Sequence, residues 1–201
     1  MQIVPPALER LITDLVKLPG IGRKTATRLA LYILRRSESD ALELAESLAA
    51  LHGSVRMCSR CFAFSGSDPC SICGDLKRDA RLICVVEEAG DLMSIEKTGV
   101  YQGVYHILHG VLSPMDGIGP EELKVRELFD RIRRQQVDEV LIATSSTVPG
   151  EATASFLMEG LRDFPVKISR LACGIPLGMD IKYADEHTLA RSIESRRPVD
   201  R

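Results

Sequence analysis

The sequence predicts a multi-domain α/β protein, and three observations along its 201 residues support this fold class. Residues 1–53 carry apolar side chains at helical spacing, which predicts an all-helical first region. Residues 54–80 are rich in Cys, Ser, Gly, Asp and Pro and lack the large apolar side chains that a core requires. From residue 81 to residue 172, strand-like and helix-like runs alternate, which predicts a mostly parallel sheet covered by helices. A loop-rich tail follows over residues 173–201.

Three helices are expected in residues 1–53. The first follows Pro5 and Pro6, since proline is well tolerated at the start of a helix. The second begins at about Lys24, after a Pro-Gly-Ile-Gly turn. The third covers about residues 39–51, and its apolar stripe is expected to face the interior. The residues of that stripe are Leu42, Ala45, Leu48 and Ala49.

The region from residue 81 to residue 172 is expected to contain alternating strands and helices. The expected strands are residues 82–86, 104–108, 139–144 and 166–171. The expected helices are residues 91–97, 121–136 and 151–162, with a further short helix near residues 188–195 in the tail. Cys84 falls within an apolar strand and is interpreted as a small core residue.

Composition and charge limit the function classes. The chain is 45% hydrophobic and has a formal net charge of −2, which excludes a uniformly basic nucleic-acid binder and directs attention to local charge. No apolar run approaches the roughly 20 residues that span a bilayer, and the first residues lack the cationic start of a secretory signal. We therefore expect a cytoplasmic protein without a membrane partner. In that reducing compartment, clustered cysteines indicate metal ligands before disulfides.

Four of the six cysteines form two Cys-x-x-Cys pairs separated by eight residues. The pairs are Cys58 with Cys61 and Cys70 with Cys73. Each such turn presents two thiolates, and four thiolates at tetrahedral corners suit one zinc ion per chain. Because protein sulfurs would fill all four positions, none is left for water or substrate, so the zinc is expected to be structural. The alternative interpretation is four unrelated thiols.

Positive charge surrounds the first glycine turn: six Lys and Arg residues and no acidic residue lie between Val16 and Ser37. With roughly 100° per residue, three of these cations fall within about 40° of one another, opposite the apolar face of the second helix. The glycine turn and the start of this helix offer backbone N–H groups that suit a phosphate, so binding should be independent of sequence and sensitive to salt. The predicted DNA-binding residues are Gly20, Gly22, Arg23, Lys24, Arg28 and Arg35.

A simpler interpretation of this turn is a helix–helix connection that uses glycine geometry, with arginines that are only solvated. A second Gly-Ile-Gly, at residues 117–119, leads into Pro-Glu-Glu. Acidic residues at a helix start repel phosphate, so this second segment is interpreted as a loop.

The stretch LPGIGRKTATRLA resembles a helix-hairpin-helix DNA-binding unit. This stretch is followed by the two Cys-x-x-Cys pairs and then by ICVVEE, LSPMDGIGP, GEATA and CGIPLG. The order of these motifs is similar to that of the bacterial RecR family of recombination mediators, over nearly the whole chain. The resemblance implies a helix-hairpin-helix region at residues 1–53 and a four-cysteine zinc finger at residues 54–80. It also implies a Toprim domain at residues 81–172 and an oligomerisation tail at residues 173–201.

For function, the resemblance implies a non-enzymatic mediator of DNA repair and recombination. Such proteins form ring-like homo-oligomers, expected here as a tetramer or a dimer of dimers, that act as clamps on DNA. They work with RecO and RecF to help load RecA at gapped or damaged DNA. In the family the basic residues of the hairpin bind DNA, which corresponds to Lys24 and Arg28 in this sequence.

The Toprim resemblance also raises an enzymatic alternative. Toprim enzymes hold magnesium with a glutamate after the first strand and an Asp-x-Asp pair after a later one. Glu87 matches the first position, but the Asp-x-Asp pair is missing from residues 145–151. A magnesium-dependent phosphoryl-transfer enzyme, nuclease-like or primase-like, would therefore depend on Glu87, Glu88 and Glu151.

A different interpretation of these acids is a surface for a basic protein. Residues 81–201 carry 15 Lys and Arg against 19 Asp and Glu, a net charge of −4, whereas residues 1–80 carry +2. The resemblance implies that Glu87 and Glu151 contact RecO. Two alternatives remain: ordinary solvated carboxylates, and a zinc-stabilised interaction module that never touches DNA.

Overall fold

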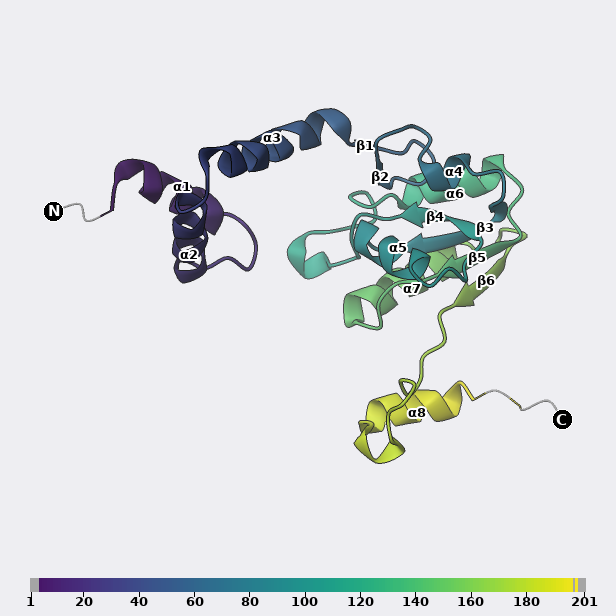
Figure 1. The fold of residues 1–201 in the computed structure, drawn as a ribbon. Coiled ribbons are helices and arrows are strands. Elements are labelled where there is room, and N and C mark those ends of the chain that lie inside the picture. Colours follow the sequence, from purple (N-terminus) through teal and green to yellow (C-terminus); the bar gives the residue numbers. More distant parts are fainter. Residues whose placement is uncertain (1–3, 197, 199–201) are drawn as a thin grey trace. The chain divides into compact units, whose positions relative to one another are not determined.

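The computed structural model describes residues 4–196 and residue 198, and the chain divides into two compact units. The first unit is Met1–Val55 and the second is Arg56–Arg201. In the described residues the first unit is helical, whereas the second contains every strand together with the later helices (Figure 1).

Helices α1 (Pro6–Val16), α2 (Arg23–Leu34) and α3 (Glu38–Ser54) form the first unit. The core between α1 and α2 is small: Ile12, Ala26 and Ala30 are almost fully buried. Partly buried apolar residues surround it, namely Val4, Leu8, Leu11, Leu15 and Ile21. The two alanines let α1 and α2 pack closely, and this packing fixes the glycine turn between them.

Helix α3 departs from the expectation that its apolar stripe faces an interior. None of its residues is buried in the described chain, and Leu42 and Leu48 are 56% and 60% exposed. The expectation is therefore wrong for the chain by itself. Apolar spacing on a helix indicates that a partner surface exists, but it does not indicate which chain supplies that surface.

A four-stranded parallel sheet with the order β4-β3-β5-β6 forms the centre of the second unit. Its strands are β3 (Asp79–Val86), β4 (Gly103–Ile107), β5 (Glu139–Ile142) and β6 (Lys167–Arg170). The connecting helices are α5 (Ala89–Glu96), α6 (Val125–Arg134) and α7 (Val148–Gly160). Every connection between these strands is a crossover through a helix, so the predicted mostly parallel sheet is confirmed.

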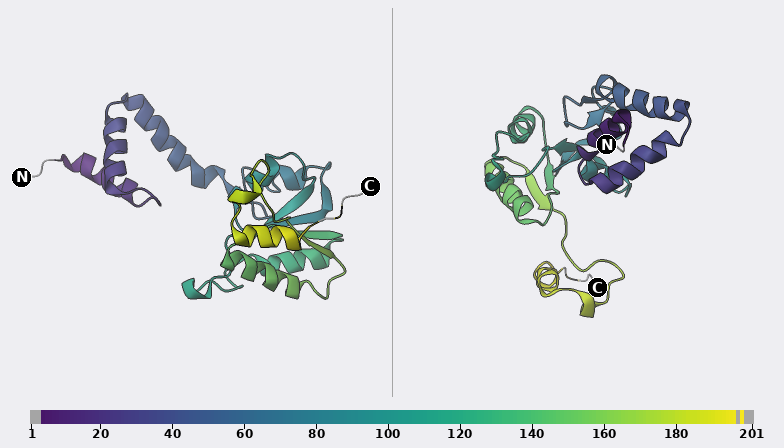
Figure 2. Two further views of the ribbon diagram at one scale, coloured as in Figure 1. Left: turned by 90° about the horizontal axis from the view of Figure 1, so that it is seen from below. Right: turned by 90° about the vertical axis from the view of Figure 1, so that its left-hand side faces the viewer.

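The two faces of the sheet carry different layers, and Figure 2 shows helices on both sides. On β3, Ile83 and Val85 belong to the core that includes Leu128 of α6. The alternate residues Cys84 and Val86 belong to a second core, shared with α5 and with the cysteine-rich segment. The alternation of side chains along a strand therefore places the cysteine-rich segment against the same face as α5.

The cysteine-rich segment contains three short elements that the sequence does not predict. Strands β1 (Arg56–Met57) and β2 (Phe64–Ser65) pair in antiparallel fashion, and the single turn α4 (Ser71–Gly74) follows. Elements of two to four residues are too short to show a hydrophobic period.

After β6 the tail passes through a short 3-10 helix, Ile181–Tyr183, into α8 (Glu186–Glu194). The Asp185 carboxylate caps α8 by accepting a hydrogen bond from the Thr188 N–H at 2.9 Å. Helix α6 begins at Val125, later than expected, because residues 121–124 form a turn. No helix in the described part of the chain is long and apolar enough to cross a membrane.

Candidate zinc centre and nucleic-acid interface

Four sulfur atoms converge in the cysteine-rich segment. The Sγ atoms of Cys58, Cys61, Cys70 and Cys73 all lie within 4.8 Å of one another. The first three residues are buried, Cys73 is partly buried, and all four are free of disulfides. Zinc–sulfur bonds of about 2.3 Å at tetrahedral angles place the sulfurs about 3.8 Å apart. The four cysteines therefore fit the donor set of one zinc ion.

The electrostatics of this segment also suit a cation. Burial opposes ionisation of Cys58, but backbone N–H groups, first that of Cys70, lower the pKa of Cys58 to about 7. The Cys70 N–H lies 3.3 Å from Cys58 Sγ, and the Cys73 N–H lies 3.4 Å from Cys70 Sγ. A hydrogen bond with Cys73, together with burial, raises the pKa of Cys61. A bound zinc ion supplies the positive charge that allows all four sulfurs to ionise, and it cross-links the two turns.

The turn between α1 and α2 has the geometry that its glycines permit. Gly20 has φ +75°, a left-handed conformation that other residues adopt only at a cost. Gly22 is extended, with φ −80° and ψ 164°, and precedes α2 without a side-chain cap. The first N–H groups of α2 therefore have no capping side chain and can face an anion.

The predicted cations around α2 fall into two groups. Lys24, Arg28 and Arg35 are exposed, and none of them pairs with an acidic group among residues 4–196 and 198. Arg23 differs, because its Nη2 lies 2.7 Å from Glu9 Oε1 on α1. The structure thus distinguishes three unpaired cations from one that already neutralises an acid.

The two acids predicted to meet a partner lie at the carboxyl edge of the sheet, and each contacts a group of the same chain. Glu87 follows β3, and its Oε1 accepts a hydrogen bond from the Ser145 N–H at 2.7 Å. Gly150 permits this approach, because a Cβ at that position would collide with the Ser145 carbonyl and the Glu87 carboxylate. Glu151, in the first turn of α7, pairs through Oε2 with Arg170 Nη1 at 2.6 Å.

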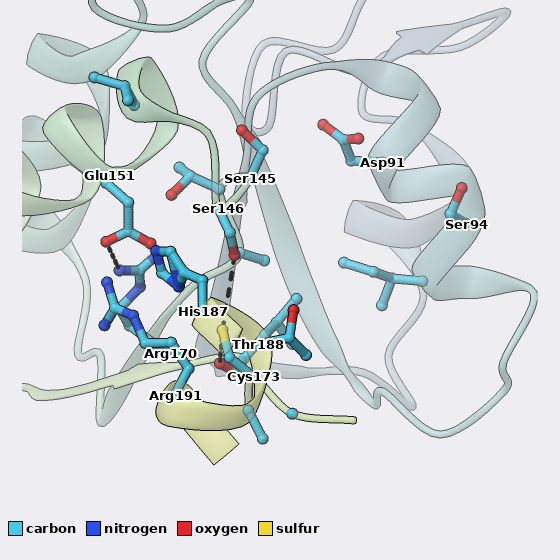
Figure 3. Close-up of a pocket in the computed structure, with 17 residues that line it drawn as sticks. Asp91, Ser94, Ser145, Ser146, Glu151, Arg170, Cys173, His187, Thr188 and Arg191 are labelled. Carbon is cyan, nitrogen blue, oxygen red and sulfur yellow. Dashed lines mark hydrogen bonds and ion pairs between the residues drawn. The ribbon is translucent and has the colours of Figure 1, made fainter. Parts of the chain in front are cut away.

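A cavity of about 960 Å³ lies beside Glu151 and is lined in part by the tail. In Figure 3 the Glu151 carboxylate is surrounded by Arg170, His187 and Arg191. The hydrogen bond from Arg170, supported by the charge of Arg191, lowers the pKa of Glu151. These basic residues are not predicted from the sequence. Arg170 ends an expected parallel strand and could have been placed near Glu151 on that ground, but nothing in the sequence brings the tail to this edge.

The three acids considered as magnesium ligands do not form a common donor group. Glu88 stands at the start of α5, where its N–H donates to Asp91 Oδ2 at 2.8 Å. Within the described residues, the four cysteines are the one group of three or more ligating side chains whose donor atoms come together. The donor group that comes together in the described chain is therefore made of sulfurs.

The fold and the sites define a modular protein in which a helical hairpin precedes a four-cysteine metal centre and a parallel α/β domain. Family models match these parts in chain order. They are "RecR, helix-hairpin-helix" over residues 8–52, the RecR four-cysteine zinc finger domain over residues 55–75, "Toprim domain" over residues 81–172 and "RecR, C-terminal" over residues 174–197.

Relatives match along almost the entire chain. The chain is 50% identical over 196 residues to "Recombination protein RecR" of Desulfatibacillum aliphaticivorans, which covers 98% of each chain. It is 50% identical over 194 residues to the protein of the same name from Syntrophotalea carbinolica, covering 96% of this chain and 98% of that one. It is 44% identical over 197 residues to that of Myxococcus xanthus, covering 98% and 100%. The chain belongs to the RecR family of recombination proteins.

Family membership and geometry agree on the metal. The four-cysteine zinc finger model matches the segment in which the four sulfurs converge, so the predicted structural zinc, one per chain, is confirmed. The helix-hairpin-helix model matches the segment with the glycine turn and the cations, which supports an involvement of DNA.

Proposed function

We propose that the chain is a non-enzymatic mediator of DNA recombination and repair that holds DNA by its sugar-phosphate backbone. The observation that carries this proposal is the set of exposed, unpaired cations Lys24, Arg28 and Arg35, next to a helix start that can face an anion. Such contacts read no base edges, so the affinity is independent of sequence and falls with salt. The proposed contact residues are Gly20, Gly22, Arg23, Lys24, Arg28 and Arg35.

The proposed working form is a ring-like homo-oligomer, a tetramer or a dimer of dimers, that encloses DNA as a clamp. Helix α3 supports association. Leu44, Leu48 and Leu51 recur at the spacing of one helix face and are 47%, 60% and 53% exposed. Covering such an apolar face with a second copy of the chain removes it from water and lowers the free energy.

The proposed protein partners are RecO and RecF, and the proposed outcome is loading of RecA at gapped or damaged DNA in the cytoplasm. Membership of a family of recombination proteins supports this role. Glu87 and Glu151 are both partly exposed at one edge of the sheet, which supports a contact between this edge and a basic surface of RecO.

Fluorescence anisotropy with labelled DNA of two unrelated sequences tests the DNA site. The Lys24→Ala/Arg28→Ala double variant should bind both sequences about tenfold more weakly at low salt, and its salt slope should fall by about one to two. The matched control is Lys97→Ala/Arg126→Ala, which removes one exposed lysine and one exposed arginine from the second unit. Wild-type affinity of the Lys24/Arg28 variant would exclude this site, and an equal loss in the control would show that total charge, not the hairpin, governs binding.

Sedimentation velocity with and without DNA tests the clamp. The wild type should form a discrete oligomer, and Leu48→Lys should dissociate it because a charge would enter the apolar face. Leu76→Lys, at a fully exposed leucine outside α3, is the control and should leave the mass unchanged. A wild type that stays monomeric at every concentration and with DNA would contradict the ring.

A further inference from the structure

The first zinc turn is docked on the Toprim domain through its backbone. The Ile107 N–H, at the end of β4, donates a hydrogen bond to the Cys61 carbonyl at 2.9 Å. In the loop after β4, His109 Nε2 donates to the Phe62 carbonyl at 2.8 Å, because a carbonyl oxygen can only accept. The turn that holds the metal and the edge of the sheet are thus joined by hydrogen bonds that involve no zinc-binding atom.

Arg131 extends this contact from helix α6 to a third successive carbonyl. Its Nη1 donates to the Arg60 carbonyl at 3.2 Å and to the Tyr105 carbonyl on β4 at 2.7 Å. Arg60 Nη1 donates in turn to the Cys73 carbonyl at 3.2 Å, which connects the first zinc turn to the second. The Arg131 guanidinium is therefore fixed between the metal centre and the sheet.

Arg131 carries its charge without an acidic partner. No carboxylate in the described chain lies within ion-pair distance of its guanidinium, although Arg133 on the same helix pairs with Asp130 at 3.0 Å. Burial lowers the pKa of Arg131, while the sulfurs of three zinc-ligating cysteines, Cys73 first, act in the opposite direction. A partly buried cation needs a compensating negative charge, and here the zinc-ligating sulfurs can provide it.

A zinc ion with four thiolates carries two net negative charges, which also require compensation away from water. We propose that Arg131 is a positioning residue for the zinc centre: its guanidinium compensates the charge of the metal-bound thiolates and fixes the first cysteine turn on the Toprim domain. Arg131 lines a cavity of about 570 Å³ together with Cys73, the one zinc ligand that is partly exposed. The acids Glu127 and Asp130 also line this cavity, but they pair with Lys124 and Arg133. Retention of zinc then depends on a helix that contributes no metal ligand.

Two substitutions separate the charge of Arg131 from its hydrogen bonds. Arg131→Gln keeps an amide donor without charge, and Arg131→Lys keeps the charge without the planar fork. In zinc-loaded, full-length protein, zinc transfer to a colorimetric chelator should be about tenfold faster for Arg131→Gln and within about threefold of wild type for Arg131→Lys. Arg126→Gln removes an exposed arginine from the same helix and should release zinc at the wild-type rate.

The pH dependence of zinc retention gives a second readout, in which the comparison of Arg131→Gln with Arg131→Lys separates the effect of charge from that of lost packing. Zinc binding displaces protons from the thiols and creates negative charge, so a nearby cation favours the zinc-bound form. A tenfold loss of zinc affinity, divided over about three protons that replace the metal, raises the pH at which half of the zinc has left by about 0.3 unit. We expect this rise in Arg131→Gln, whereas Arg131→Lys should stay near wild type.

The possible outcomes are distinct. A wild-type rate for folded Arg131→Gln contradicts the proposal, and so does equal acceleration by Gln and Lys, which would assign the effect to the hydrogen bonds and not to the charge. If Arg131→Gln does not fold with zinc, cobalt(II) titration of the three metal-free chains under refolding conditions decides, because cobalt binding is then coupled to docking of α6 on the cysteine turn. Wild type and Arg131→Lys should develop thiolate-to-cobalt absorption at about tenfold lower cobalt concentration than Arg131→Gln, and equal midpoints contradict the proposal.

Discussion

The Glu151 carboxylate on α7 lies 2.6 Å from the Arg170 guanidinium on β6, so the acid proposed to meet RecO already has a basic partner in its own chain. A cation of RecO would have to compete with Arg170. We predict that Glu151→Gln weakens the RecO complex by about tenfold, whereas Arg170→Met, which frees the carboxylate, strengthens it by about threefold. Biolayer interferometry with immobilised RecO measures both changes.

Glu159→Gln is the matched control for this prediction, because Glu159 lies on the same helix with its side chain 75% exposed. Its complex with RecO should be close to wild type. An undiminished complex with Glu151→Gln would remove Glu151 from the contact. Equal weakening by both variants would indicate that RecO binds through the general charge of the surface and not through a specific contact with Glu151.

Gly20 and Gly53 both have open space around them, but substitution should change stability in opposite directions. A Cβ would meet no atom within 4 Å at either position. Gly20 has φ +75°, so Gly20→Ala should destabilise the hairpin by about 1 kcal/mol. Gly53 lies in α3, so Gly53→Ala should stabilise that helix by about 0.5 kcal/mol.

Hydrogen exchange with mass spectrometry checks both glycine substitutions, because the two helices report separately. Amides of α2 should exchange about fivefold faster in Gly20→Ala, and amides of α3 about twofold slower in Gly53→Ala. If Gly20→Ala left the exchange of α2 unchanged, the left-handed turn would not be required for the hairpin.

His106, buried in β4, should make the protein less stable in acid. Burial lowers its pKa to about 4, against an ordinary value of 6.5, although its Nε2 donates to the Lys124 carbonyl at 2.7 Å. Between these two pKa values, His106 binds a proton in the unfolded chain but not in the folded chain. The free energy of unfolding therefore falls as the pH is lowered through this window. From pH 7 to pH 5 the loss from this residue should be about 2 kcal/mol.

Urea unfolding of wild type and His106→Gln at pH 7 and pH 5 isolates this contribution. Glutamine can keep a donor toward the Lys124 carbonyl but does not titrate. Zinc thiolates also protonate in this range, so the relevant quantity is the difference between the two proteins. An equal loss of stability in both would exclude His106 as the cause.

Removal of one zinc ligand should disturb more than the cysteine-rich segment. In Cys61→Ser the zinc content should fall from about one per chain to near zero, and the free energy of unfolding should fall by more than about 3 kcal/mol. Cys173→Ser replaces an exposed cysteine outside the cluster and should change neither quantity. Metal analysis and thermal unfolding provide the measurements, and full zinc content in Cys61→Ser would contradict the four-sulfur centre.

The parts of the fold that could be predicted are those whose signals are local. The strands of the sheet are apolar runs separated by segments of helical length, and α1 and α2 have clear apolar stripes on either side of a glycine turn. The orientation of α3 could not be predicted, because Leu42 and Leu48 show that the helix is apolar but not what covers it. The two short strands around the zinc turn have no period at all.

The same distinction holds for the sites. The zinc ligands could be predicted because Cys-x-x-Cys spacing is itself the ligand geometry. Lys24 and Arg28, one helical turn apart on α2, stay a prediction as DNA contacts. The contact of Arg131 with the zinc turn could not be predicted, since it spans 71 residues of sequence. Arg170 could have been placed near Glu151 only as the end of an expected parallel strand. The only sequence signal for Arg131 is its position next to the buried Ile132, and this signal separates it only weakly from the other arginines of α6.

The docking of the first zinc turn sets a condition on how this chain can change. Three successive carbonyl groups, those of Arg60, Cys61 and Phe62, accept hydrogen bonds from helix α6, strand β4 and the loop after β4. An insertion between Cys58 and Cys61 would displace all three together, even if the ion could still be held. The number of residues in that turn is therefore determined twice, once by coordination chemistry and once by the domain on which the turn rests.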